Sequence, residues 1–240
     1  MKVFIVDNYE QMSQKGAEII ADVVKSNSNP VLGLATGSTP IGTYEKLAEM
    51  NRSGEISFKN VRTVNLDEYV GLDKNSDQSY VYFMSENLFD KIDIDKNNTN
   101  LPSGIAADFD EECKRYSALL EANRQDIQLL GLGSNGHVGF NEPGTPFDSM
   151  THIVDLTEST IKDNSRLFSN IEEVPRQAIT MGISEIMKSK KVLVLASGRN
   201  KANAVYQMVK GEISENCPAT VLQNHPDCIV VVDKDAAALI

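Results

Sequence analysis

Short apolar runs alternate along the chain with segments whose apolar residues recur at helical spacing. The apolar or alternating runs predict strands at 3–6, 31–35, 61–66, 127–132, 151–156, 191–196, 218–222 and 228–232. The segments with helical spacing lie at 9–24, 41–50, 80–88, 108–122, around 186 and from 201 onward. Strands that alternate with helices predict an α/β fold with a mainly parallel sheet, covered by helices on both faces.

Two segments lack a clear period. Residues 90–104 are polar and contain Pro102 and Gly104, which indicates a long surface connection. Residues 157–175 contain Arg166 and fit a mobile lid over the sheet edge as well as an ordinary surface connection. Because the chain shows no repeat, low-complexity tract or linker, we expect residues 1–240 to form a single α/β domain.

Composition narrows the classes of function. The chain has 240 residues, of which 41% are hydrophobic and 24% are charged, which is typical of a soluble globular protein. The net charge of −11 disfavours nucleic acid as a partner, and it means that an anionic substrate must be held by a local site. No apolar stretch approaches the roughly 18 residues of a membrane span, and the N-terminal run is too short for a signal peptide.

The cysteines and histidines do not suggest a metal or disulfide framework. Cys113, Cys217 and Cys228 form no CxxC pair and fit reduced thiols. The three histidines lack the paired spacing that zinc sites show. We therefore expect a cytoplasmic protein that has no membrane association and binds no metal.

Two loops that follow predicted strands are rich in small and hydroxyl residues. The first is Thr-Gly-Ser-Thr-Pro at 36–40, and the second is Ser-Gly-Arg-Asn-Lys at 197–201. Backbone N–H groups where a strand turns into a helix bind phosphate without a large net charge. Neither loop has the P-loop lysine or the full GxGxxG spacing. Helix capping by Ser38 or Thr39, and a solvated basic turn at 197–201, remain alternatives.

Candidate acid–base residues follow two other strands. The strand at 127–132 runs into a glycine-rich turn that carries Asn135, His137 and Glu142. Imidazole can take and return a proton near neutral pH, and Glu142 could orient it. Asp67 follows the strand at 61–66 and could remove a proton α to a carbonyl, although an aspartate there is often a cap or turn residue. If the backbone is extended, Glu68 points away from Asp67.

Five motifs occur in order over most of the chain. They are Gly-Leu-Ala-Thr-Gly-Ser-Thr-Pro (33–40), Asn-Leu-Asp-Glu-Tyr-Val-Gly (65–71), Gly-Ser-Asn-Gly-His-Val-Gly-Phe-Asn-Glu-Pro (133–143), Asn-Ser-Arg (164–166) and Ala-Ser-Gly-Arg-Asn-Lys-Ala (196–202). With these motifs the chain closely resembles the glucosamine-6-phosphate deaminase family. The resemblance implies a Rossmann-like fold and the conversion of glucosamine 6-phosphate and water into fructose 6-phosphate and ammonia. It implies no metal or organic cofactor.

The resemblance also implies roles for individual residues. His137 would assist opening of the sugar ring, with Asn135 and Glu142 in support, and Asp67 would move the C2 proton to C1. The residues implied to hold the phosphate are Gly37, Ser38, Thr39, Arg166 and Lys201. The region around Arg166 would form the lid.

The chain departs from the family in two respects. Many relatives have aspartate where this chain has Asn135, and asparagine can orient His137 but cannot ionise. Longer, allosterically activated relatives have two basic residues where His152 and Val154 flank Ile153, and they extend beyond the position of Ile240. We therefore expect a short form that is not activated by N-acetylglucosamine 6-phosphate and is a monomer or a small homo-oligomer.

Two other functions fit part of the pattern. A 6-phosphogluconolactonase typically has Asp-Glu-Arg where this chain has Asp67-Glu68-Tyr69, and it lacks the Phe-Asn-Glu-Pro of 140–143. A non-catalytic sugar-phosphate sensor would keep the phosphate-binding groups and lose the acid–base residues. Because Asp67, His137 and Glu142 are all present, the deaminase is favoured over both.

Overall fold

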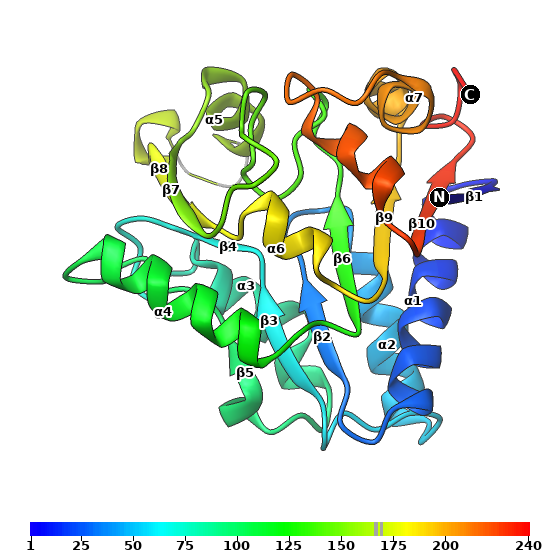
Figure 1. Ribbon diagram of the computed structural model, residues 1–240. Helices are drawn as coiled ribbons and strands as arrows, with labels where there is room; N and C mark the ends of the chain where they lie inside the picture. The colour runs from blue at the N-terminus through cyan, green and yellow to red at the C-terminus, as the bar shows by residue number, and fades with distance from the viewer. Residues whose placement is uncertain (166–167, 169) are drawn as a thin grey trace.

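A parallel sheet runs through the middle of the molecule (Figure 1). The structure is a computed structural model and describes residues 1–165, 168 and 170–240. Its strands are β1 (Lys2–Val6), β2 (Val31–Leu34), β3 (Arg62–Asn65), β5 (Thr99–Asn100), β6 (Ile127–Gly131), β9 (Val192–Ala196) and β10 (Cys228–Asp233). The spatial order is β1-β10-β9-β6-β2-β3-β5, and all neighbours are parallel. The predicted mainly parallel α/β fold is confirmed.

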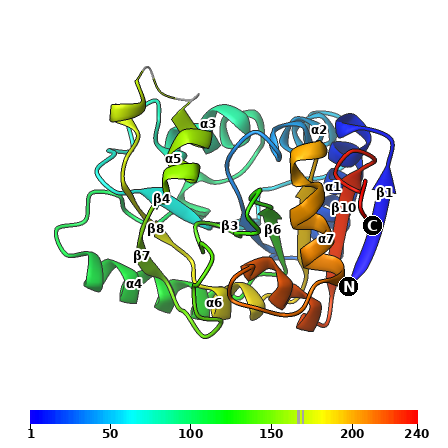
Figure 2. The same ribbon diagram turned by 90° about the horizontal axis from the view of Figure 1, so that it is seen from above.

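Helices cover both faces of this sheet. On one side lie α1 (Tyr9–Ser26), α2 (Ile41–Arg52) and α3 (Tyr80–Asn87), and on the other lie α4 (Phe109–Ala122) and α6 (Ile183–Met187) (Figure 2). Figure 1 shows α7 (Ala202–Lys210) above the carboxyl end of β9. Asn8 caps α1, because its side chain accepts the Gln11 N–H at 2.9 Å. Among the described helices, none is long and apolar enough to cross a membrane.

The central strands are buried on both faces, which explains their continuous apolar sequences. All five residues of β9 are buried, and β10 is almost as buried. Each large aliphatic side chain removed from water in this way contributes about 1.5–3 kcal/mol to folding. This rigid core fixes the ends of the strands, from which the loops of the site emerge.

A second sheet was not foreseen from the sequence. It consists of β4 (Asp67–Tyr69), β8 (Gln177–Thr180) and β7 (His152–Asp155) in the order β4-β8-β7, with antiparallel neighbours. The strand predicted at 151–156 therefore exists, but it belongs to this sheet. The pairing places Asp67 opposite Thr180. Above it lies α5 (Glu158–Asn164), followed by the short η4 (Ile171–Glu173).

Three local predictions were wrong. Residues 218–222 form the 3₁₀ helix η6 (Pro218–Asn224), because Pro218 occupies its first position and the Thr220 hydroxyl donates back to the Cys217 carbonyl at 2.7 Å. Neither Ser38 nor Thr39 caps α2, since the N-cap residue is Pro40, whose side chain makes no capping hydrogen bond. The segment 90–104 is more structured than a surface connection, because it contains η1 (Phe89–Lys91) in part, η2 (Lys96–Asn98) and β5.

Gly104 locks this segment against the small sheet. A Cβ atom at residue 104 would lie 2.0 Å from the Tyr69 carbonyl oxygen, and the Gly104 carbonyl accepts the Gly71 N–H at 2.7 Å. No side chain fits at this position unless the backbone next to Asp67 moves.

We expect Gly104→Ala to lower the free energy of unfolding by about 2 kcal/mol or more, because the added methyl group meets backbone rather than a flexible side chain. Gly131→Ala is the matched control, since a Cβ atom there has nothing within 4 Å. It should change the free energy of unfolding by less than about 1 kcal/mol. Urea denaturation of both variants measures this, and equal effects would contradict the packing described for Gly104.

Candidate active site

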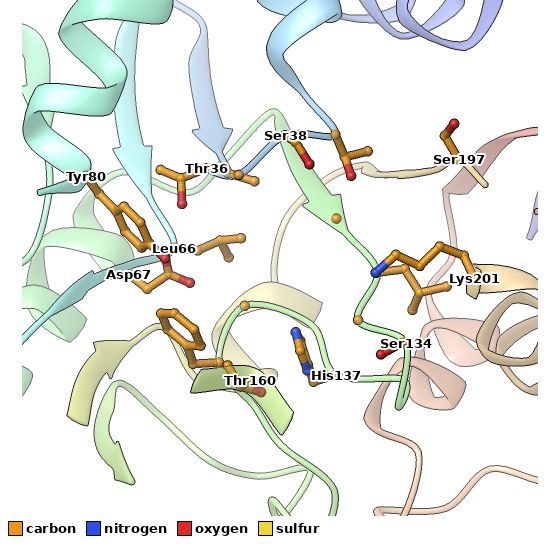
Figure 3. A pocket seen from close by; sticks show the side chains of 18 of the residues that line it. Thr36, Ser38, Leu66, Asp67, Tyr80, Ser134, His137, Thr160, Ser197 and Lys201 are labelled. Atoms are coloured by element: carbon orange, nitrogen blue, oxygen red, sulfur yellow. The ribbon is translucent and has the colours of Figure 1, made fainter. Parts of the chain in front are cut away.

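A cleft of about 540 Å³ opens at the carboxyl ends of the central parallel strands. Loops that follow β2, β3, β6 and β9 line it, and Figure 3 shows their side chains. Carboxyl ends of parallel strands meet at one edge of a sheet, so residues distant in sequence converge there. The cleft brings together the predicted residues Gly37, Ser38, Thr39, Asp67, His137 and Lys201.

The turn after β6 depends on its glycines. A Cβ atom at Gly133 would lie 2.4 Å from the His137 ring, so only glycine allows the imidazole to fold over this position. Gly139 has a positive φ of 58°, and a Cβ atom there would lie 3.5 Å from Asp67 Oδ2. The turn therefore places His137 in the cleft and passes directly beside Asp67.

The Glu142 carboxylate contacts side chains of this turn with one oxygen and side chains at the start of α5 with the other. Its Oε2 accepts the Asn135 Nδ2–H at 2.8 Å and lies 3.5 Å from His137 Nδ1. Its Oε1 accepts hydrogen bonds from the hydroxyls of Thr160 and Thr157, which belong to the start of α5. Although burial raises the pKa of Glu142, His137, Thr160 and Asn135 together lower it to about 2. Glu142 is thus an ionised carboxylate that faces the imidazole.

Asn135 supports the turn from behind the cleft. Its Oδ1 accepts the backbone N–H of His137 at 3.2 Å, while its Nδ2 donates to Glu142. Neither Asn135 nor Glu142 lines the cleft itself. Through these contacts Asn135 and Glu142 hold His137 in position, and His137 does line the cleft.

Asp67 has a different environment from Glu142. Its side chain is buried, and burial followed by the nearby Glu68 carboxylate raises its pKa to about 8. Glu68 points away from Asp67, as the sequence predicted, and accepts the N–H groups of Tyr69, Tyr80 and Val81. Burial raises the pKa of Glu68 to about 7 in spite of these hydrogen bonds.

Only the second of the two small-residue loops lies far from Asp67. Figure 3 shows Asp67, Tyr80 and Thr36 at one end of the cleft, Ser197 and Lys201 at the other, and Ser38 and His137 between them. Gly37 has a positive φ of 91°, which lets the first loop turn sharply after β2. The prediction for Arg166 lies outside the described residues.

Several lining residues were missed in the sequence. They are Thr36, Tyr80, Phe83, Ser134, Thr160, Ser197 and Asn200. Ser197 and Asn200 lie in the loop 197–201, which the sequence had already indicated as a phosphate site, so they could have been predicted with Lys201. Tyr80 and Thr160 enter from α3 and α5, whose placement over the cleft follows from tertiary packing. In the described part of the chain, no group of three or more His, Cys, Asp or Glu side chains could hold a metal ion.

Comparison with known proteins gives consistent full-length matches. Residues 7–231 match the family model of glucosamine-6-phosphate isomerases/6-phosphogluconolactonase. The chain is 54% identical over 241 residues to a glucosamine-6-phosphate deaminase of Thermoanaerobacter pseudethanolicus, covering 100% of this chain and 95% of the relative. It is 52% identical over 241 residues to the glucosamine-6-phosphate deaminase of Clostridium perfringens, covering 100% of both.

Solved structures agree with these matches. A monomeric glucosamine-6-phosphate deaminase superposes with a TM-score of 0.98 at 47% identity, covering 100% of both chains. A 6-phosphogluconolactonase from Leishmania guyanensis superposes with a TM-score of 0.78 at 21% identity, covering 98% of this chain and 97% of the other. At that identity the second likeness shows the shared fold alone.

The raised pKa of Asp67 predicts a pH-dependent gain in stability for Asp67→Asn. Between pH 4 and pH 8 the unfolded chain releases the Asp67 proton while the folded chain keeps it, so wild-type stability is lost as the pH rises through this window. The variant avoids this loss, and we expect its free energy of unfolding to exceed that of the wild type by at least about 2 kcal/mol more at pH 9 than at pH 4.

Asp22→Asn, at an exposed position of α1, is the control and should show the same difference from wild type at both pH values. Urea denaturation at pH 4 and pH 9 provides the measurement. A pH-independent effect of Asp67→Asn would mean that Asp67 is ionised in the folded protein well below pH 8.

Proposed function

The chain belongs to the family of glucosamine-6-phosphate isomerases and 6-phosphogluconolactonases, and on this premise we propose that it is a glucosamine-6-phosphate deaminase. The reaction takes D-glucosamine 6-phosphate and water to D-fructose 6-phosphate and ammonia, a step of amino-sugar catabolism. The observation that carries the proposal is the shared cleft, which combines Asp67 and His137 with two loops suited to phosphate. Relatives with this name that match the full length support it.

His137 opens the sugar ring in this proposal. The imidazole takes the proton of the anomeric hydroxyl and returns a proton to the ring oxygen, which converts the pyranose into the open-chain aldehyde. Ionised Glu142, 3.5 Å from Nδ1, stabilises the imidazolium that forms between these transfers. Asn135 fixes Glu142 and the His137 backbone and takes no part in proton transfer.

Asp67 carries out the isomerisation. It takes the C2 proton of the open-chain sugar and delivers it to C1, while the C2 ammonium loses one proton and the C1 oxygen gains one. Water then hydrolyses the resulting iminium at C2 to fructose 6-phosphate and ammonia. Burial makes the Asp67 carboxylate a strong base, because its pKa is raised to about 8. The cationic amine that the substrate carries at C2 favours the ionised form of Asp67 when it binds.

The phosphate lies at the far end of the cleft from Asp67. The loop 36–39 and the turn 197–201, which we call the phosphate cradle, hold it. The loop 36–39 offers backbone N–H groups and hydroxyls, and the turn 197–201 offers the Lys201 ammonium. We also assign Arg166 to this phosphate, on the family motif alone. Binding energy from a group remote from the chemistry positions C1 and C2 against Asp67.

The lactonase is the alternative activity in the same family. A lactone hydrolysis needs no base that reaches two adjacent carbons, so it would leave the buried Asp67 unexplained. The presence of Asp67, His137 and Glu142 around one cleft also disfavours a non-catalytic sensor. The similar monomeric deaminase supports a monomer for this chain. Our proposal that N-acetylglucosamine 6-phosphate does not activate it is based on the sequence alone, because His152 and Val154 replace the two basic residues of activated relatives.

We expect the purified protein to release ammonia and fructose 6-phosphate in equal amounts from glucosamine 6-phosphate. Coupled assays for each product measure this, and 6-phosphogluconolactone serves as the second substrate. Hydrolysis of the lactone with no ammonia from the amino sugar would replace the deaminase proposal by the lactonase. Turnover of neither would remove both.

Asp67→Asn should abolish the exchange of the substrate C2 proton with solvent, because the amide cannot act as the base. Incubation with glucosamine 6-phosphate in D₂O, followed by proton NMR of C2, measures the exchange. Asp22→Asn, at an exposed position of α1 outside the cleft, is the control and should leave the exchange unchanged. Exchange at the wild-type rate in Asp67→Asn would exclude Asp67 as the base.

A further inference from the structure

A buried carboxylate lies directly behind the second loop of the phosphate cradle. Asp233, the last residue of β10, is only 6% exposed. Its Oδ2 accepts the Ser197 hydroxyl at 2.5 Å, and its two oxygens share the Gly198 N–H at 3.1 Å. Oδ1 also accepts the Ala236 N–H at 2.8 Å. Although burial raises the pKa of Asp233, these hydrogen bonds lower it overall, so the carboxylate is charged near neutral pH.

These hydrogen bonds determine which groups of the turn 197–201 remain available to bind a ligand. A serine hydroxyl has one hydrogen, and Ser197 gives it to Asp233, so Ser197 faces the cleft only as an acceptor. The Gly198 N–H is likewise directed away from the cleft. Gly198 has a positive φ of 93°, and directly after it η5 (Arg199–Lys201) carries Asn200 and Lys201 into the cleft. Asp233 therefore fixes the point at which the loop turns toward the ligand.

A tyrosine holds the first loop in a similar way. The Tyr9 hydroxyl donates to the Ser38 carbonyl at 3.1 Å and accepts the Gly42 N–H at 2.9 Å. It thus bridges the loop 36–39 to the first turn of α2, where the N-cap residue Pro40 has no side chain that could accept an N–H. Tyr9 is 38% exposed and does not line the cleft.

We propose that Asp233 and Tyr9 are positioning residues for the sugar phosphate, which set the shape of the two cradle loops from outside without touching the ligand. They come from opposite ends of the sequence, and both act on backbone or hydroxyl groups next to the cleft. The inference rests on the proposed function, because it assumes that the cradle holds the substrate phosphate. Neither residue takes part in the acid–base steps assigned to His137 and Asp67.

The prediction is a selective loss of phosphate binding. In Asp233→Asn the amide oxygen can still accept the Gly198 N–H, but the amide nitrogen that replaces Oδ2 cannot accept the Ser197 hydroxyl. Because the turn is then no longer held in place, we expect the KM for glucosamine 6-phosphate to rise about tenfold or more. The Ki of inorganic phosphate as a competitive inhibitor should rise in parallel, while kcat stays within about twofold of the wild type. Asp227→Asn is the matched control, because Asp227 pairs with Lys191 at the opposite end of β10.

Tyr9→Phe tests the first loop and keeps the fold, because the lost hydroxyl belongs to a partly exposed side chain. We expect about a threefold rise in both the KM and the phosphate Ki, since one bridging hydroxyl is lost. Tyr82→Phe, at an exposed tyrosine of α3, should change neither value. The double variant of Asp233 and Tyr9 should multiply the two effects on KM, because the residues act on separate loops.

A purely structural role would give a different result. If Asp233→Asn and Tyr9→Phe lower the melting temperature but leave the KM and the phosphate Ki at wild-type values, the proposal is overturned. A fall in kcat at unchanged KM would also contradict it, because the chemistry and not the cradle would then be affected.

Direct phosphate titration separates this proposal from the proposed function. Inorganic phosphate is titrated into wild type and variants by isothermal calorimetry, which needs no turnover. Absence of ammonia release with phosphate binding that weakens in Asp233→Asn would remove the deaminase and keep the cradle. Ammonia release with unchanged phosphate binding in both variants would keep the deaminase and remove the cradle proposal.

Discussion

The buried carboxylate of Glu142 is the constraint on which the site depends. A carboxylate removed from water costs several kcal/mol unless hydrogen bonds and an opposite charge offset it. Here Asn135 and His137 face one oxygen, and Thr157 and Thr160 donate to the other. The glycine turn after β6 and the start of α5 are thereby joined through one group. The segment that leads into Arg166 is anchored on the same carboxylate that orients the imidazole.

Asp67 shows what happens to a buried carboxylate that finds no such partners among the described residues. Burial and the neighbouring Glu68 raise its pKa to about 8, whereas that of Glu142 falls to about 2. Two acids in one site are thus separated by environment into a permanent anion and a proton acceptor, a division that recurs in acid–base enzymes. The same burial that destabilises the ionised form of Asp67 in the folded protein makes its carboxylate a stronger base in the proposed reaction.

The sequence predicted most of the cleft because strand ends are local features. Asp67, His137 and the two small-residue loops each follow a strand, and a parallel sheet brings such ends together. Thr160 could not be found in this way, because its contact with Glu142 spans 18 positions and depends on the fold of α5 over the turn. The small antiparallel sheet was missed for the same reason, since β4 pairs with β8 far along the chain. At 218–222 a proline outweighed the apolar pattern and produced a 3₁₀ helix.

Asn135 gains a physical meaning from these contacts. Its amide donates to Glu142 Oε2 at 2.8 Å, a distance at which two carboxylates could not both be ionised. An aspartate at residue 135 would have to share a proton with Glu142, and the pair would titrate as a unit. With asparagine at residue 135 no proton has to be shared, because the Asn135 amide itself donates the hydrogen bond and Glu142 stays ionised. The asparagine therefore fixes the charge opposite His137, so that in the proposed ring opening no carboxyl pair behind the imidazole takes part in proton transfer.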